Sequence, residues 1–292
     1  MFSPLGELVW YLSGSNQLEQ IIHYIPKYKN YSNDGTSLSG AYGPRIFEVD
    51  RRINSHNPTD HWQRIIDLLI KRGDTRNAVI QIFSNSDTYA DNKDVPCTCT
   101  MQFAVRGKRL NLHVHMRSND AVLGLPHDIF AFTMMQEIAA RELGVEIGRY
   151  THSVASLHLY DDTHEAQPRS MAQQFLDEPL PDDVPMPPMP WGDPWPALRY
   201  LIAAERAIRE GKYDHADIEG MDPYWKDLIL LLRAHSIAKS PDGEHELHRL
   251  TSQFASNVYH LYVLDRLERK RVKRNSTPDM FKDYQNGNEK DT

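Results

Sequence analysis

The sequence predicts an α+β protein in which a mixed sheet is packed with helices and is followed by a helical C-terminal extension. Between residues 78 and 162, β-branched segments of alternating polarity lie on both sides of a long apolar segment with helical periodicity. The stretch 179–196 then holds eight of the 18 prolines, and the segments beyond it are helical in pattern. We therefore expect a sheet-containing domain and a separate helical extension.

Two helices are predicted before the sheet. The first covers residues 3–13, with Ser3 as its N-cap and a glycine just past its end. The second covers residues 59–72, where apolar residues recur at helical spacing, and it ends at Gly73.

The sheet region contains four segments with strand character and one with helical character. Gly107 and Lys108 are typical of a tight turn, so the segments on either side are expected to form a hairpin. The long apolar segment is expected to pack as a helix against the sheet. In chain order the expected elements are strands 78–83, 100–107 and 109–117, a helix over 126–143, and a strand over 145–162.

The region after the prolines contains three expected helices and a basic, polar end. Proline-rich chain is extended and semi-rigid, so it is expected to act as a linker. The polar end lacks the apolar residues that a packed segment needs, and we expect it to be disordered. The expected units are an α+β domain over 1–178, a linker over 179–196, an extension over 197–275 with helices at 195–210, 223–239 and 243–271, and a disordered tail over 276–292.

Charge and hydropathy argue against two classes of protein. The net charge of −7 and the pI near 6.0 disfavour a general nucleic-acid-binding surface, because such surfaces cluster Lys and Arg. No apolar run approaches the roughly 18 residues of a membrane span. We expect a soluble, cytoplasmic protein, in which a few local arginines would still suffice to bind a small anion.

Cys97 and Cys99 are the only cysteines, and their spacing on one strand is poor geometry for a disulfide. Both are expected to be reduced, with Cys99 structural. A lone cysteine is more often a small buried apolar residue than a nucleophile. The surroundings of Cys97 favour catalysis, because residues 116–129 supply a cation, a hydroxyl and two carboxylates. Arg76 upstream and Gln102 downstream add further polar groups.

His113 and His115 share one face of an expected strand, as metal ligands often do. No third ligand stands at a spacing typical of zinc sites, so we interpret both as ordinary strand residues. No metal site is predicted.

Five segments carry motifs in a consistent order between residue 7 and about residue 162: GELVWYLSGSN (6–16), AYGPR (41–45), PCTCTMQFAV (96–105), RSNDAVLGLPHD (117–128) and LHLY (157–160). Together they resemble the motifs of thymidylate synthases and the related cytidylate hydroxymethylases. The fourth segment is similar to the Arg-Ser-x-Asp-x-x-Leu-Gly-Leu-Pro-x-Asn signature of that family. The resemblance implies a thymidylate-synthase-like fold and a nucleotide-binding catalytic domain over residues 1–178.

The resemblance also implies a mechanism. Cys97 would add as a thiolate to C6 of a pyrimidine, and C5 would then capture the methylene group of 5,10-methylenetetrahydrofolate. A cationic environment is expected to favour the thiolate. Glu7 matches the glutamate that manages proton transfers through ordered water. Asp120 matches the aspartate beside the pyrimidine, and Tyr42 the tyrosine near the nucleophile.

The nucleotide-binding residues follow from the same resemblance. Arg117 and Ser118 would hold the phosphate near the cysteine, and a guanidinium suits bidentate phosphate binding. His158 and Tyr160 would bind the 3′-hydroxyl of the sugar. Gln102 is placed with this substrate-binding set.

Arg76 resembles the first of two arginines that the family sends across a homodimer interface to the partner's phosphate. Asn77 stands in place of the second arginine, so one cation per phosphate site is lost. The alternative is that Arg76 and Arg117 are ordinary surface arginines.

Asp128 stands where thymidylate synthases carry asparagine. An asparagine amide offers an acceptor for uracil N3–H and a donor for O4, whereas cytosine presents the opposite pattern. A protonated carboxyl group donates to cytosine N3 and accepts from its amino group, and the same exchange distinguishes cytidylate hydroxymethylases. Asp128 therefore predicts a cytosine nucleotide, unless it is a drifted residue in an inactive homologue.

Two further departures favour a hydroxymethyl product and raise a question about the folate site. Thr98 replaces the family histidine next to the cysteine, and YIPKYKNY (24–31) replaces a tryptophan-rich wall. A more polar wall would admit water, and water attack on the methylene intermediate gives a 5-hydroxymethyl group. The short closing segment with which the family covers the folate has no counterpart in this sequence.

Three functions follow as hypotheses. The leading one is a CMP or dCMP 5-hydroxymethylase that uses 5,10-methylenetetrahydrofolate. The second is a UMP or dUMP C5 methylase or hydroxymethylase, and the third is a nucleotide-binding homologue without catalysis. Thr98 and the missing closing segment favour the third, whereas the joint presence of Cys97, Glu7, Asp120 and Arg117 argues against it.

Overall fold

The computed structural model describes residues 1–47, 60–89, 91–163, 167–177, 185–212, 218, 220–240 and 243–276, and its architecture is α+β, as the sequence predicts. The helices of this part are α1 (Phe2–Leu12), α2 (Leu18–Ile22), α3 (Gly43–Ile46), α4 (His61–Lys71), α5 (Leu125–Glu142), α6 (Pro168–Asp177), α7 (Trp195–Arg209), α8 (Pro223–Lys239), α9 (Glu244–Thr251) and α10 (Asn257–Ser276). The strands are β1 (Val79–Gln81), β2 (Thr98–Arg106), β3 (Arg109–Met116), β4 (Asn119–Asp120), β5 (Glu146–Val154) and β6 (Leu157–His158).

Four strands form one mixed sheet in the order β1-β2-β3-β5. The β1/β2 and β2/β3 pairs are antiparallel, and the β3/β5 pair is parallel. A parallel pair needs a crossover, which α5 supplies. The strands β4 and β6 form a separate parallel pair, in which Asp120 lies opposite His158. This short pair brings two of the sequence motifs together.

The hairpin between β2 and β3 forms where the sequence predicts it. Gly107 has φ 56° and Lys108 has φ 64°. Two consecutive residues with positive φ are typical of the two-residue turn whose twist matches that of the flanking strands. The turn fixes the register in which Arg106 lies opposite Arg109.

One face of the sheet is buried under helices and the other is open. Met101 and Phe103 on the inner face are 0% exposed, and the ring of Trp62 from α4 meets Phe103 edge-on at 6.0 Å between centroids. Gln102 and His113, which point to the opposite face, are half-buried and exposed. Alternation along a strand produces this division.

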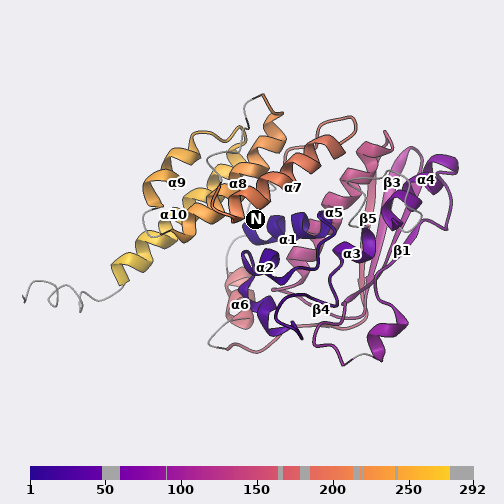
Figure 1. The fold of residues 1–292 in the computed structure, drawn as a ribbon, viewed down its shortest axis with the longest axis horizontal. Coiled ribbons are helices and arrows are strands. Elements are labelled where there is room, and N and C mark those ends of the chain that lie inside the picture. Colours follow the sequence, from indigo (N-terminus) through magenta and orange to yellow (C-terminus); the bar gives the residue numbers. More distant parts are fainter. Residues whose placement is uncertain are drawn as a thin grey trace, which may run out of the picture.

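The C-terminal helices complete the core around α1. Figure 1 shows the sheet on one side, α1 and α5 in the middle, and the helices α7 to α10 on the far side of α1. The Glu205 side chain of α7 accepts hydrogen bonds from Gln20 Nε2 (3.2 Å) and Tyr24 OH (3.1 Å). Helices α7 and α8, which both pack against α1, thus share a core with the sheet-containing part of the chain. Of the predicted linker 179–196, residues 179–184 lie outside the described part, residues 185–194 contain neither helix nor strand, and residues 195–196 begin α7.

Several element boundaries differ from the predicted ones. Ser3 lies inside α1, whose N-cap is Met1. The expected strand over 145–162 is two strands, β5 and β6, separated by a bend. The expected helix over 243–271 is also two helices, because the Asp227 carboxylate accepts from the backbone N–H groups of Ala255 and Ser256 and holds a loop between α9 and α10.

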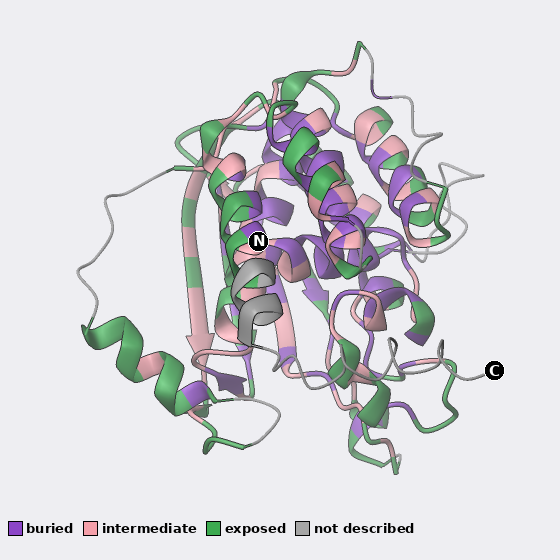
Figure 2. Ribbon diagram, turned by 90° about the vertical axis from the view of Figure 1, so that its left-hand side faces the viewer, coloured by how far each residue is buried: buried purple, intermediate pink, exposed green. Residues whose placement is uncertain are grey.

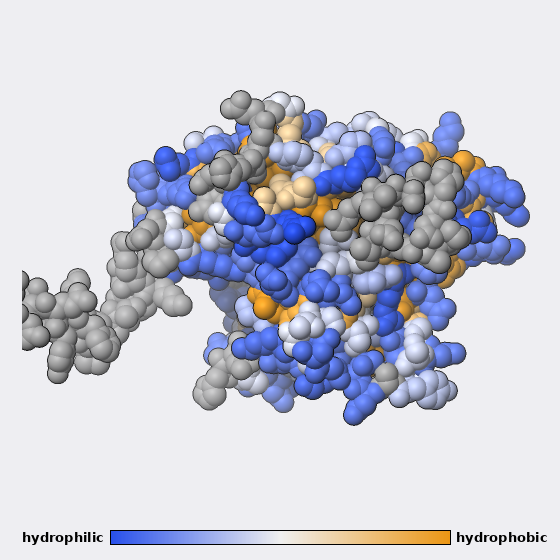
Figure 3. Space-filling view, viewed as in Figure 1, coloured by the Kyte–Doolittle hydropathy of each residue, from blue (hydrophilic) through white to orange (hydrophobic). Residues whose placement is uncertain are grey.

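The surface is mainly hydrophilic on the side seen in Figure 3, with apolar patches between the polar side chains. Helix α6, which the sequence did not predict, has only Pro168 buried (Figure 2). No described helix combines the length and apolar character that crossing a membrane requires. Of the predicted tail 276–292, only Ser276, the last residue of α10, lies within the described residues.

Candidate functional site

Cys97 lies immediately before β2 and is held by Arg117, which follows β3. Arg117 donates from Nε to the Pro96 carbonyl and from Nη2 to the Val95 carbonyl, each at 2.9 Å. The same Nη2 lies 3.8 Å from Cys97 Sγ. The guanidinium therefore fixes the loop that presents the thiol and also places a positive charge beside it.

The environment of the thiol does not favour a thiolate in the free protein. Burial raises the pKa of Cys97, since the charged form loses hydration, and Arg117 opposes this effect. The carboxyl groups of Asp128 and Asp94 raise this pKa further. The expected cationic stabilisation of a thiolate is therefore outweighed in this state by desolvation, which is the largest effect on the thiol.

Asp128 lies in the first turn of α5, with 9% of its surface exposed. Asn119 Nδ2 donates to Asp128 Oδ2 at 2.9 Å. Burial raises the pKa of Asp128 well above its usual range, and the charge of Glu7 adds to the effect, whereas the Asn119 hydrogen bond opposes it. These surroundings favour a neutral carboxyl group.

The glycine of the same motif is required by packing. A Cβ atom on Gly124 would lie 2.3 Å from Asn119 Oδ1, too close for any side chain. The motif therefore lets the chain pass directly over the amide that holds Asp128.

Asp120 organises the loop and the neighbouring strand. Its Oδ1 accepts from the backbone N–H groups of Val122 and Leu123, and its Oδ2 accepts from the N–H of Tyr160 at 3.2 Å. Burial disfavours the carboxylate, yet these hydrogen bonds and the nearby His158 hold the pKa of Asp120 below its usual value. Asp120 is thus an ionised acceptor that joins β4 to the segment after β6.

Glu7 of α1 is buried, and each of its carboxylate oxygens has a partner. Tyr28 OH donates to Oε1 at 2.6 Å, and His127 Nδ1 lies 2.7 Å from Oε2. Neither partner was among the predicted site residues. The signal for His127 was available, since it is a titratable residue next to Asp128 within the motif.

A group of tyrosines surrounds the two acids. Tyr42 OH accepts from the backbone N–H of Thr98 at 3.2 Å, and its ring lies 5.1 Å from that of Tyr11. Burial raises the pKa of Tyr42 well above its usual range, and Asp128 and Cys97 add to this effect. Tyr42, the predicted tyrosine near the nucleophile, therefore lies within electrostatic range of Asp128 and Cys97, and its hydroxyl remains protonated.

The remaining predicted residues at this end lie at the rim. The rings of His158 and Tyr160 are 4.6 Å apart, and Tyr160 is 57% exposed. Ser118 is half-buried between Arg117 and Asn119. The structure therefore brings together Cys97 and the residues that the resemblance placed around it, which are Glu7, Tyr42, Arg117, Ser118, Asp120, Asp128, His158 and Tyr160.

Gln102 and Arg76 lie elsewhere. Gln102 Nε2 donates to the Arg76 carbonyl at 3.0 Å, which ties β2 to the chain before β1. At about 3.3 Å per residue, Gln102 is some 16 Å along the strand from Cys97. Its side chain also points to the outer face, so its assignment to the same substrate site is wrong for a single chain.

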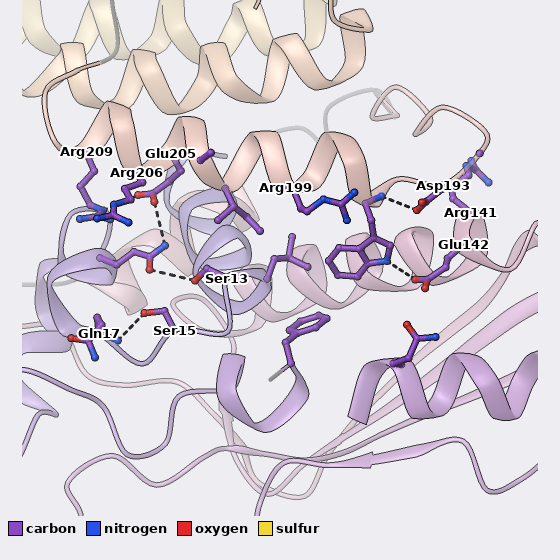
Figure 4. Close-up of a pocket in the computed structure, with 18 of the residues that line it drawn as sticks. Ser13, Ser15, Gln17, Arg141, Glu142, Asp193, Arg199, Glu205, Arg206 and Arg209 are labelled. Carbon is purple, nitrogen blue, oxygen red and sulfur yellow. Dashed lines mark hydrogen bonds and ion pairs between the residues drawn. The ribbon is translucent and has the colours of Figure 1, made fainter. Parts of the chain in front are cut away.

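A cavity of about 1200 Å³ lies between the α1–α2 loop, the end of α5 and α7 (Figure 4). None of the predicted site residues lines it. Its arginines Arg206 and Arg209 are paired with Glu210 and Glu205 at 2.8 and 3.1 Å. The cavity is thus separate from the Cys97 site, and the positive charge of these two arginines is balanced by ion pairs within the protein.

Comparison with known proteins gives relatives of one kind. A family model described as thymidylate synthase matches residues 2–182. The deoxyuridylate hydroxymethyltransferase of Delftia phage PhiW-14 is 31% identical over 176 residues, which cover 55% of this chain and 46% of that protein. The thymidylate synthase of Haloferax volcanii is 26% identical over 174 residues, which cover 54% and 51%. The chain spans about half the length of these curated relatives.

Among solved structures, thermostable thymidylate synthase A from Bacillus subtilis matches 60% of this chain and 60% of its own, with 21% identity and a TM-score of 0.48. The family match covers well over half of the chain and contains the whole Cys97 site, from Glu7 to Tyr160. By that match, the chain belongs to the thymidylate synthase family.

Proposed function

We propose that the protein is a pyrimidine nucleotide C5 hydroxymethyltransferase with a nucleotide site around Cys97. The observation that carries this proposal is the grouping of the half-buried Cys97 thiol with the buried carboxyl groups of Glu7 and Asp128, next to Arg117. Covalent addition to C6 needs the nucleophile, and reading the base needs a buried donor and acceptor. The names of the phage relatives, deoxyuridylate hydroxymethyltransferase, support the reaction class.

Cys97 acts as the nucleophile once the substrate is bound. Its raised pKa means that the proton must leave during binding or attack, and Arg117 Nη2 at 3.8 Å is placed to stabilise the sulfur anion. Arg117 and Ser118 bind the phosphate, and His158 and Tyr160 bind the sugar. These four residues line the side of the site that faces solvent.

Asp128 supports a cytosine nucleotide as the preferred substrate. Asn119 donates to Oδ2, so a proton on the neutral acid resides on Oδ1. A hydroxyl on one oxygen and a carbonyl on the other match cytosine N3 and its amino group.

The second candidate substrate is a uracil nucleotide. Relatives from Delftia phage PhiW-14, Bacillus phage SP01 and Pseudomonas phage M6 are named for deoxyuridylate. A neutral carboxyl group that reverses its donor and acceptor roles can also pair with uracil.

The proposed one-carbon donor is 5,10-methylenetetrahydrofolate, which would supply a methylene group at the oxidation level of formaldehyde. The fit rests on exposed aromatic surface beside the site. Tyr31 is 39% exposed, its ring lies 6.0 Å from that of Tyr28, and the charge of Cys97 influences its pKa. The flat bicyclic ring of the folate would stack on this surface, close to Glu7, whose carboxylate accepts a hydrogen bond from Tyr28 OH.

A homodimer is proposed on two grounds. Arg76 is exposed beside the open outer face of the sheet, far from the Cys97 of its own chain. If two subunits pack with these open sheet faces together, Arg76 of each subunit can reach the phosphate site of the other. Sedimentation should show a dimer at micromolar concentration, whereas a fully active monomer would contradict the proposal.

The activity is tested by incubating the protein with 5,10-methylenetetrahydrofolate labelled in its methylene carbon and with each of CMP, dCMP, UMP and dUMP. Label is expected in a 5-hydroxymethyl cytosine nucleotide. Label in a uracil nucleotide would support the second candidate. Absence of labelled product with all four nucleotides would reject catalysis and leave a nucleotide-binding homologue.

A further inference from the structure

His127 joins the first helix to the catalytic motif through a chain of polar contacts. Its Nδ1 lies 2.7 Å from Glu7 Oε2, and its Nε2 lies 3.4 Å from Ser3 Oγ. The histidine side chain is 22% exposed and that of Glu7 is 6% exposed. The imidazole therefore has one edge on a buried carboxylate and remains partly open to solvent.

The partners determine the tautomer of the ring. An ionised carboxylate only accepts hydrogen bonds, so Nδ1 carries a proton and donates it to Glu7. In a neutral ring, Nε2 is then the basic nitrogen, and the Ser3 hydroxyl can donate to it. A carboxylate orients an imidazole in the same way in hydrolases with a carboxylate, a histidine and a nucleophile.

The pair lies next to the group that reads the base. His127 directly precedes Asp128, and the charge of Glu7 raises the pKa of Asp128. Asp128 in turn influences the pKa of Cys97. His127 thus contacts an acid that lies within electrostatic range of Asp128, and Asp128 lies within electrostatic range of Cys97.

We propose that His127 Nε2 takes the proton from the water that forms the hydroxymethyl group, with Glu7 as its positioning residue. This inference rests on the proposed hydroxymethyltransferase function. In this step the water oxygen bonds to the exocyclic methylene carbon on C5, and one of its protons moves to Nε2. The exocyclic π pair re-forms the C5–C6 double bond, and the C6–S bond breaks with its electrons returning to Cys97. The proton on Nε2 then passes to the Cys97 thiolate and restores the thiol and the neutral imidazole. Tetrahydrofolate has left in the preceding step, its nitrogen taking up the equivalent of the proton that C5 lost, so charge and electrons balance.

His127→Asn separates this role from a structural one. The asparagine amide nitrogen occupies nearly the place of Nδ1 and preserves the hydrogen bond to Glu7, but it accepts no proton at neutral pH. His245→Asn on the exposed face of α9 is the matched control. Both variants should keep the melting temperature and the nucleotide affinity of the parent protein.

The measurement is a single turnover with a nucleotide tritiated at C5, quenched at successive times. Tritium release reports Cys97 addition and methylene transfer, and the hydroxymethyl nucleotide reports water attack. In His127→Asn, tritium release should stay within about threefold of the parent rate, while hydroxymethyl formation falls about a hundredfold or more. The acidic limb of the pH profile of hydroxymethyl formation should disappear as well.

Two outcomes would overturn the inference. Equal loss of both rates would mean that His127 serves only to hold Glu7, and unchanged rates would mean that another group activates the water. Failure of the parent protein to release tritium from any of the four nucleotides would instead reject the proposed function, which makes the two failures distinguishable.

Discussion

At the scale of single residues, the site couples three acidic groups. Glu7 raises the pKa of Asp128, and Asp128 raises the pKa of the Cys97 thiol. A ligand that changes the charge of one group therefore changes the proton affinity of the others. Any titration measured for this site belongs to the set rather than to one side chain.

Cys97→Ser should abolish turnover and preserve nucleotide binding. The hydroxyl is a far weaker nucleophile than the thiol, whereas binding depends on Arg117, Ser118, His158 and Tyr160. Turnover and equilibrium binding should be measured on the same preparation. Retention of more than about a tenth of the activity would show that another nucleophile operates.

Asp128→Asn should shift the preference from cytosine to uracil nucleotides. The amide restores a donor for O4 and an acceptor for N3–H, and it leaves a mismatched contact with cytosine. Each mismatched buried contact costs about 1–3 kcal/mol, which corresponds to roughly tenfold to hundredfold discrimination. The ratio of kcat/KM for CMP over UMP, and for dCMP over dUMP, should be compared in both proteins. An unchanged ratio would show that Asp128 does not read the base.

The sequence was informative about the residues whose positions are fixed by motif order. Cys97, Asp120 and Asp128 meet because short connections around β4 leave them little freedom. Gln102 follows Cys97 by only five residues, but strand alternation puts its side chain on the face of His113, away from the buried side of the sheet. His127 stands next to Asp128 in the motif, but its contact with Glu7 forms only when α1 and α5 pack together.

At the scale of elements, the contact between α7 and the first two helices rests on one buried acid. Glu205 is 1% exposed and accepts from Gln20, Tyr24 and Arg209, the last from its Nε at 3.1 Å. Burial raises the pKa of Glu205, and Arg209 opposes the effect. The carboxylate therefore satisfies donors from two distant segments of the chain.

Glu205→Ala should destabilise the protein by about 2–4 kcal/mol, because Tyr24 OH and the Arg209 guanidinium would lose their buried acceptor. The free energy of unfolding from urea titration is the measurement. Glu210→Ala on the same helix is the control, since its exposed ion pair with Arg206 should contribute little. Equal effects of the two substitutions would contradict the assigned role of Glu205.

The sequence also predicted most long elements but not how they assemble. Helix α8 is buried on most of its faces, so nothing in its pattern indicates that α1 and α7 are among its partners. The proline-rich stretch predicts a stiff linker and so suggests a separate unit after it. Composition does not indicate whether the helices that follow pack against the first part of the chain. Helix α6 was missed, since its apolar residues Phe175 and Leu176 are exposed at 70% and 80% and its pattern reflects no core contact in the described structure.

At the scale of the whole molecule, the half-buried His23 and the buried His235 connect the end of α2 to α8. His235 Nε2 lies 3.0 Å from the His23 carbonyl, and Arg266 of α10 lies 3.2 Å from His235 Nδ1. Burial lowers the pKa of His235 to about 3 and that of His23 to about 4, and Lys239 adds to both shifts. The folded protein therefore keeps both rings neutral.

Stability should fall as the pH drops from about 6.5 towards 4. An unfolded chain protonates these histidines near pH 6.5, whereas the folded protein resists protonation until far lower pH. The free energy of unfolding is therefore unaffected by these histidines above pH 6.5. Below that pH it falls, by on the order of 2 kcal/mol per histidine at pH 4, because only the unfolded chain takes up the protons. Urea titrations of the parent protein and of His235→Gln at pH 7 and 4.5 measure this. The variant should show a shallower pH dependence, and parallel curves would refute the assignment.

The burial of α1 between early and late elements has a consequence for biosynthesis. One side of α1 meets α5, and another meets α7 and α8, which follow it by about 190 residues. A nascent chain that has emerged only as far as α6 already contains every candidate catalytic residue, but Phe2 and its neighbours still lack their cover. Chaperones would have to shield that helix on the ribosome until α8 emerges. We therefore expect prematurely released chains to be degraded rather than to accumulate as partial enzymes.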